Sequence, residues 1–135
     1  MSRTRRGVAL AATLAGLMTV LASPAMAGDA GSSSRMSPVG DWRTKTNGVT
    51  QTITFTSDGK VSGDAGCNRF VGGYTTDGTS ITIGPLATTL MACEQPVMDA
   101  EATFLVRLQA AVSFQAKAQT LRIYAPKDLI RFVRS

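Results

Sequence analysis

The stretch GDAGCNRFVGGYTTDG, residues 63–78, decides the fold, because its glycines, its cysteine and its Asn-Arg pair interrupt an otherwise strand-like pattern. Glycines inside strands permit a bulge or tight bend at a barrel corner, or leave room for a neighbouring segment. A second interpretation places Asn68 and Arg69 at the barrel rim, where they would present hydrogen-bond donors to a partner. The corner is the preferred interpretation, because strand glycines serve that structural purpose more often than binding.

The residues before this stretch predict a bulged hairpin. In QTITFT, residues 51–56, Ile53 and Phe55 lie on one face, with threonines on the other. Pairing Phe55 with Val61 and Ile53 with Gly63 keeps the apolar faces aligned. The register leaves 57–59 as a three-residue loop whose last residue, a glycine, takes the left-handed conformation.

Two further hairpins follow from the same alternation. Pairing Tyr74 with Ile81 leaves only Asp77-Gly78 as the loop, which suits a type I′ turn in which both residues need positive φ. Near the C-terminus, Phe114 pairs with Ile123 in a short hairpin. The Asp-Gly pairs are therefore interpreted as turns and not as ligand sites.

One helix interrupts the strands at residues 94–110. Its apolar residues recur at three- and four-residue spacing, as in Val97, Ala100, Phe104 and Leu108. Asp99 and Glu101 are expected near the positive end of the helix dipole and on different sides of the helix. Together these patterns predict seven or eight antiparallel strands around one helix, a mainly β fold.

The N-terminal residues 1–27 predict a secretory signal peptide, with three arginines, an apolar run and a small-residue cleavage site. Residues 28–37 are polar and small, as in a flexible leader, and a single domain is expected over 38–135. Loss of three of the 14 basic residues would leave 11 against nine acidic ones, a net charge of +2. This near balance argues against nucleic acid as a partner.

The residue types exclude several chemistries. The sequence contains no histidine, which removes the usual general base, the histidine-containing dyads and the commonest transition-metal ligand. The aspartates lie mostly in turns, and the glycines do not lead into a helix as a phosphate-binding loop requires. We therefore expect no catalytic residue, no cofactor and no metal, and the protein is not expected to be an enzyme.

Cys67 and Cys93 are the only two cysteines, 26 positions apart. In an oxidising compartment an even number of cysteines favours a disulfide, which would tie the glycine-rich stretch to the segment before the helix. The alternative is a reactive thiolate at Cys67, assisted by Arg69. The disulfide is preferred, because redox thiols usually lie closer together in sequence.

The run GCNRFVGGYTTDGTSITIGPLATTLMAC, residues 66–93, followed by a helix, closely resembles the META domain of HslJ-like heat-shock-associated proteins. Gly40-Asp41-Trp42 is similar to the Trp-bearing first strand of that family, with Trp42 expected in the core. The resemblance implies a small, mainly antiparallel, barrel-like β-domain with one helix. It also implies a domain of the kind found in bacterial envelope and secreted proteins that are linked to stress and antibiotic tolerance. The resemblance implies no known catalytic residue or cofactor.

Three functions follow as hypotheses. The first is a non-enzymatic, exported domain, periplasmic or secreted, acting in stress tolerance through protein or surface contacts. The second is a secreted inhibitor of a hydrolase such as a protease or lysozyme, with GPLATTL, residues 84–90, as the suspected loop. The third is a carrier of small apolar ligands beside Trp42. We expect a monomer with an envelope or secreted protein as partner, and little membrane contact by Arg122, Arg131 and Arg134.

Overall fold

The computed structural model describes residue 16 and residues 36–135. The predicted signal peptide, apart from residue 16, and the predicted leader, apart from its last two residues, lie outside the described residues. Within the described part of the chain, none of the helices is long and apolar enough to cross a membrane.

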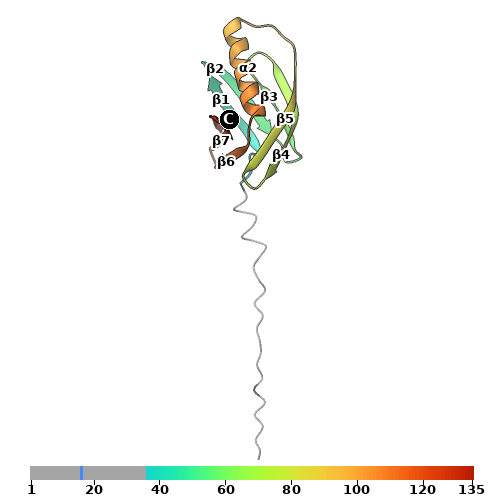
Figure 1. The fold of residues 1–135 in the computed structure, drawn as a ribbon, viewed down its shortest axis with the longest axis vertical. Helices are drawn as coiled ribbons and strands as arrows, with labels where there is room; N and C mark the ends of the chain where they lie inside the picture. Colours follow the sequence, from blue (N-terminus) through green and yellow to red (C-terminus); the bar gives the residue numbers. More distant parts are fainter. Residues whose placement is uncertain (1–15, 17–35) are drawn as a thin grey trace, which may run out of the picture.

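The chain forms a closed, antiparallel barrel in which each strand pairs with the next and the last pairs with the first (Figure 1). The prediction of a mainly β barrel with one helix is confirmed for residues 36–135. The eight strands and the helix, in chain order, are β1 (Gly40–Thr46), β2 (Val49–Phe55), β3 (Lys60–Asp64), β4 (Arg69–Asp77), β5 (Ser80–Thr88), α2 (Gln95–Gln109), β6 (Ser113–Ala116), β7 (Thr120–Ala125) and β8 (Asp128–Arg134).

The barrel interior is filled by the apolar side chains that alternate inward along the strands. Trp42 is fully buried, as predicted, and its indole Nε1 donates to the Pro38 carbonyl oxygen at 2.7 Å. Phe104 of α2 packs edge-on against Phe70 and Phe132, with ring centroids 5.9 and 6.2 Å apart. The helix thus contributes its own aromatic ring to the barrel core, which stabilises the fold by removing apolar surface from water.

The first hairpin agrees with the sequence-based prediction. Phe55 pairs with Val61 and Ile53 with Gly63, and Gly59 has a φ of 85°. The Gly59 amide donates to the Thr56 carbonyl oxygen at 3.2 Å and so closes the bulged loop. Phe114 pairs with Ile123 in the later hairpin, also as predicted.

The predicted register of the second hairpin is wrong by two residues. Tyr74 pairs with Ile83, and Asp77 pairs with Ser80, so that the loop is Gly78-Thr79. Gly78 has a φ of 60°, and it is the first loop residue that takes the positive φ. A glycine at the first loop position, with only that residue at positive φ, is typical of a type II′ turn. The structure therefore has this turn in place of the predicted type I′ turn.

The glycines of 63–78 have different roles. A Cβ atom on Gly63 would lie 2.0 Å from the Thr52 carbonyl oxygen, and one on Gly72 would lie 2.6 Å from that of Pro85. These two glycines leave room for a neighbouring strand, and the shift in the β4–β5 register between Gly72 and Tyr74 shows an irregularity of the kind expected at a bulge, whereas Gly73 has only ordinary contacts at 3.6 Å. Gly66 was expected within a strand, but it lies in the turn between β3 and β4 with a φ of 124°.

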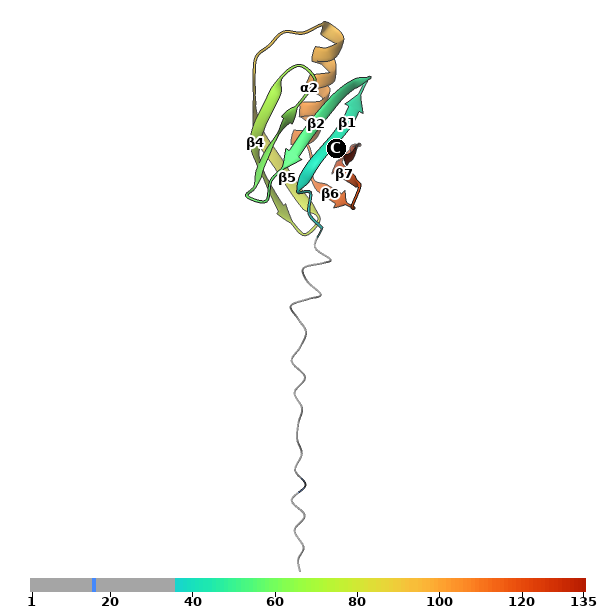
Figure 2. The ribbon, with the colours of Figure 1, turned by 180° about the vertical axis from the view of Figure 1, so that it is seen from behind.

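The helix α2 connects β5 to β6 and packs against β5, β1, β7 and β8 (Figures 1 and 2). It begins with a proline in its first turn, and it has Arg107 in its last turn, as predicted. Contrary to the expectation for Asp99 and Glu101, its first turn contains no acidic residue. The start of α2 lies at one end of the barrel, beside the segment that leaves β5.

Candidate functional site

The predicted disulfide between Cys67 and Cys93 is present, with the two Cα atoms 6.0 Å apart. Cys67 lies in the turn between β3 and β4, and Cys93 lies two residues before α2. The bond therefore ties this turn to the end of the segment 89–93, here called the 89–93 loop. The Cys93 end of the loop is thus anchored to a turn 26 positions earlier in the sequence.

Asn68 follows Cys67 directly in the chain, and its side chain binds the 89–93 loop. Its side-chain oxygen accepts hydrogen bonds from the Met91 amide at 2.6 Å and from the Thr89 hydroxyl at 2.8 Å. Its side-chain nitrogen donates to the Met91 carbonyl oxygen at 3.1 Å. The Asn68 amide thus pairs with both backbone groups of Met91, as a neighbouring strand would, and is only 3% exposed.

The side chain of Glu101 on α2 fixes the position of Asn68. Its carboxylate accepts from the backbone amides of Cys67 at 3.1 Å and Asn68 at 2.5 Å, and from the Asn68 side chain at 2.7 Å. Glu101 is only 6% exposed. Because unpaired donors in a buried turn are costly, this carboxylate stabilises the turn and orients the amide of Asn68.

A third buried polar residue, Gln51 of β2, joins the same end of the barrel. Its side-chain nitrogen donates to the carbonyl oxygens of Ala65 and Ala100 at 3.2 Å each, and its oxygen accepts from the Thr46 hydroxyl at 2.7 Å. The buried polar side chains of residues 36–135 are Thr46, Gln51, Asn68 and Glu101. All of them lie in this one cluster, and all are hydrogen-bonded.

Sequence reasoning missed the roles of Glu101 and Gln51. Asp99 and Glu101 do point to different sides, since Asp99 is exposed and Glu101 is buried. The signal for Glu101 was its spacing, because positions 97, 101, 104 and 108 share one face of a helix. For Gln51 the signal was its parity with Ile53 and Phe55, which places all three on the inward face of β2.

The 89–93 loop presents apolar side chains to solvent although its backbone is held in place. Leu90 is 95% exposed and Met91 is 58% exposed. The Thr89 amide donates to the Arg69 carbonyl oxygen at 3.0 Å, and the Thr89 hydroxyl accepts from the Arg69 amide at 3.1 Å. The loop is thus fixed at Thr89, Met91 and Cys93, and the Leu90 side chain projects between these points.

The two predicted contact residues have different surroundings. Asn68 is buried, and its side chain bonds to Thr89, Met91 and Glu101 inside the molecule, whereas Arg69 is exposed. Of the suspected segment 84–90, residues up to Thr88 belong to β5, and only the last two lie in the loop. Arg69 and the side chains of the 89–93 loop are exposed at this end of the barrel.

Three ionisable groups of the described chain have a shifted pKa: Tyr74, Asp128 and Asp58. Burial raises the pKa of Tyr74, whose hydroxyl donates to the Thr56 carbonyl oxygen at 2.6 Å. The Arg107 guanidinium lowers the pKa of Asp128, and the Thr56 hydroxyl lowers that of Asp58. Residues 36–135 contain no group of three or more acidic or cysteine side chains placed to hold a metal. Tyr74, Asp128 and Asp58 all lie outside the 89–93 loop.

Comparisons with known proteins agree with this architecture. The chain is similar to a protein from Burkholderia xenovorans solved by NMR, with 28% identity, a TM-score of 0.58, and coverage of 71% of this chain and 81% of that one. A second NMR structure shares 20% identity at a TM-score of 0.56, covering 70% and 87% of the two chains, and so supports the fold alone. No curated protein sequence matches. The family model described as META domain matches residues 35–135. The chain therefore belongs to the META domain family.

Proposed function

We propose that this META domain is a non-enzymatic, exported binding module that presents the 89–93 loop to a protein partner in the cell envelope. The observation that carries the proposal is the exposure of Leu90, 95%, on a backbone fixed by Asn68 and the disulfide. Leu90 and Met91 are adjacent and both exposed, and contiguous apolar surface of this kind marks interaction sites. A loop that is already ordered loses less conformational freedom on binding.

Export is supported by the disulfide, because such bonds persist in oxidising compartments. The signal-like residues 1–27 point the same way. A role in envelope stress or antibiotic tolerance rests on the family to which the chain belongs. The contact surface would be Leu90 and Met91 with Arg69 beside them.

Site-specific photo-crosslinking tests this proposal. A photoreactive amino acid would replace Leu90 in one variant and Val106 in a control variant, because Val106 is also exposed, 66%, but lies on α2. We expect a partner protein to be crosslinked from position 90 and not from position 106. Once purified, this partner should bind the wild type but not Leu90→Asp. A partner that binds Leu90→Asp as well as the wild type would refute the role of the loop.

A second candidate function is the inhibition of a hydrolase. It is favoured by the shape of the 89–93 loop, since a rigid loop with one projecting apolar side chain resembles an uncleavable substrate segment. The purified protein would be assayed against a panel of serine proteases and against lysozyme. Inhibition that is lost in Leu90→Asp and kept in Val106→Asp supports this function. Trp42, by contrast, is enclosed by the core, which gives no support to a ligand carrier.

A further inference from the structure

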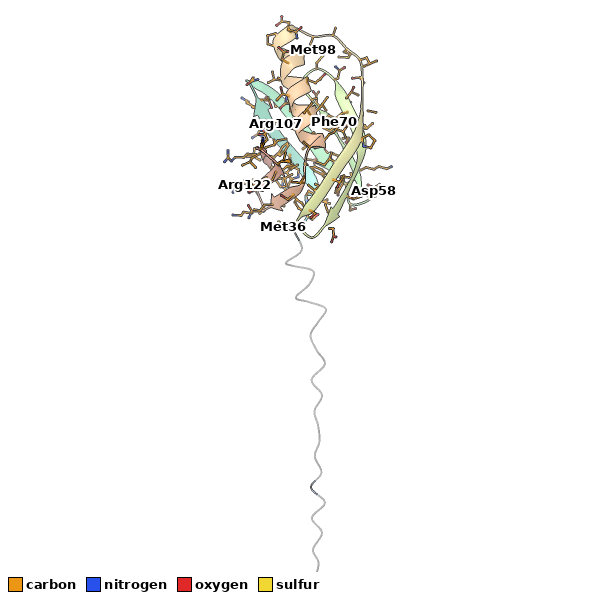
Figure 3. The ribbon with its side chains drawn as sticks, viewed as in Figure 1. Met36, Asp58, Phe70, Met98, Arg107 and Arg122 are labelled. Atoms are coloured by element: carbon orange, nitrogen blue, oxygen red, sulfur yellow. A yellow bond between two sulfur atoms is a disulfide. The ribbon has the colours of Figure 1, made fainter. Side chains whose placement is uncertain are left out.

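The charges of the described chain are separated by face. Strand β1 and residues 113–135 carry seven basic and two acidic side chains, whereas residues 47–112 carry three basic and six acidic ones. The small net charge of the domain therefore conceals a charge of +5 on β1 and residues 113–135, which include β6, β7 and β8 and are here called with β1 the positive side, and of −3 on residues 47–112, here called the negative side, which include α2. Figure 3 shows Arg122 on the positive side and Asp58 on the opposite side of the barrel.

A surface groove of about 430 Å³ lies on the positive side, over the seam where β8 pairs with β1. Arg43 and Lys45 line it from β1, and Arg131 lines it from β8. Thr50 contributes a hydroxyl and Val133 an apolar wall. This seam lies across the barrel from β4 and β5, so the groove is separate from the 89–93 loop.

A further cation, Arg122, lies beside the groove on β7, the strand next to β8. Arg122 and Arg131 are directly opposite each other on β7 and β8, and like charges in such a pair destabilise a sheet. Within residues 36–135 the ion pairs are Lys60 with Asp58 and Arg107 with Asp128, neither of which involves a groove residue. The two acidic residues of this side bind elsewhere, Asp41 to the Thr54 hydroxyl and Asp128 to Arg107. The groove thus has positive charge without a carboxylate from the described chain to balance it.

We infer that this groove binds a linear polyanion that carries phosphate groups. Guanidinium groups bind phosphate through two parallel hydrogen bonds, and the Thr50 hydroxyl offers a further donor. The groove cations of β1 and β8, together with Arg122 on β7 beside the groove, come from three neighbouring strands spaced about 4.8 Å apart, and so they form a row about 10 Å long. A row of this kind fits several closely spaced negative charges better than a single anion. Such a ligand would also relieve the repulsion between Arg122 and Arg131.

Calorimetric titration of the purified protein tests the inference with three probes: short-chain inorganic polyphosphate, orthophosphate, and vesicles containing phosphatidylglycerol. The groove variant is Arg43→Gln/Arg131→Gln. Its matched control, Lys60→Gln/Arg69→Gln, removes the same charge from the negative side. We expect polyphosphate to bind the wild type and the control, and to bind the groove variant at least about tenfold more weakly, because two charge-assisted contacts are lost. Orthophosphate should bind much more weakly than polyphosphate.

Three results would overturn the inference. Equal weakening in both double variants would assign binding to net charge alone, and undetectable polyphosphate binding would leave the groove without its ligand. Vesicles that bind more tightly than polyphosphate would assign the positive side to a membrane surface. Circular dichroism and urea unfolding of both variants would establish that the substituted proteins remain folded.

Discussion

The Asn68 side chain lies between the Glu101 carboxylate and the Met91 backbone, with its nitrogen 2.7 Å from Glu101 Oε2 and its oxygen 2.6 Å from the Met91 amide nitrogen. One buried amide therefore connects the helix α2 to the exposed 89–93 loop. The helix cannot shift without moving the carboxylate that orients this amide. The position of the loop thus depends on the packing of α2 in the barrel.

Removal of the Glu101 carboxylate should destabilise the fold strongly. In Glu101→Ala, the buried amides of Cys67 and Asn68 lose their acceptor, which we expect to lower the free energy of unfolding by about 3 kcal/mol. Glu101→Gln should cost less, roughly 1–2 kcal/mol, because its amide oxygen still accepts while its NH₂ group opposes that of Asn68. Urea unfolding measures both values.

The control for these variants is Asp99→Ala, two residues earlier on the same helix. Asp99 is exposed and bonds only to the Gln95 side chain, so the loss should stay below about 0.5 kcal/mol. Equal effects of Glu101→Ala and Asp99→Ala would mean that the buried carboxylate does not support the turn.

The disulfide should mainly determine the free energy of unfolding of the domain, whereas Asn68 should determine the local order of the 89–93 loop. In the double variant Cys67→Ser/Cys93→Ser, loss of a cross-link over 26 residues should cost roughly 3–4 kcal/mol of unfolding free energy. The Met91 amide should nevertheless stay protected from hydrogen exchange, because its acceptor is Asn68 Oδ1. In Asn68→Ala the disulfide remains while this protection is lost. Exchange measured by NMR separates the two, and rapid Met91 exchange in the serine variant would contradict the assigned role of Asn68.

Sequence patterns predicted the elements of the barrel better than its polar interior. The register of Phe55 with Val61 followed from alternation and a short loop, and the two cysteines left a single disulfide pairing. Pairing Tyr74 with Ile81 or with Ile83 places the same faces inward, so that only the turn distinguishes the two registers. Alternation alone could not make that choice.

The polar cluster could not be predicted because its partners are distant in sequence. Glu101 binds residues 33 and 34 positions earlier, and Gln51 binds a carbonyl 49 positions later. A polar residue on an apolar face appears in sequence as an interruption of the pattern, and only the fold reveals its partners. The separation of charge has the same origin, because net charge contains no information on which strands become neighbours.

Alanine at Gly63 should disrupt the barrel, whereas alanine at Gly73 should not. A Cβ atom at residue 63 would lie 2.0 Å from the Thr52 carbonyl oxygen and 2.8 Å from Phe70 Cζ. Backbone in a paired strand cannot move aside easily, so we expect a loss of about 2–4 kcal/mol in the free energy of unfolding. At residue 73 the nearest atom would be 3.6 Å away, and reduced freedom of the unfolded chain should make the change neutral or slightly stabilising. Thermal unfolding compares the two, and equal melting temperatures would rule out this close approach of β3 to β2.

The contact between α2 and β8 should make stability depend on pH in the acid range. Arg107 donates to both Asp128 carboxylate oxygens and to the Leu129 carbonyl oxygen, and this lowers the pKa of Asp128 below its ordinary value of 3.8. A carboxyl whose pKa is lower in the folded state adds stability that is fully present above pH 3.8 and is lost as the pH falls through the folded pKa. Asp128→Asn should therefore be less stable than the wild type at neutral pH, by a small amount because the pair is partly exposed, and equal to it in strong acid. Asp58 titrates in the same direction in both proteins and cancels in the comparison. Urea unfolding at a series of pH values measures the difference, and a difference that persists unchanged into strong acid would show that Asp128 acts through packing and not through its charge.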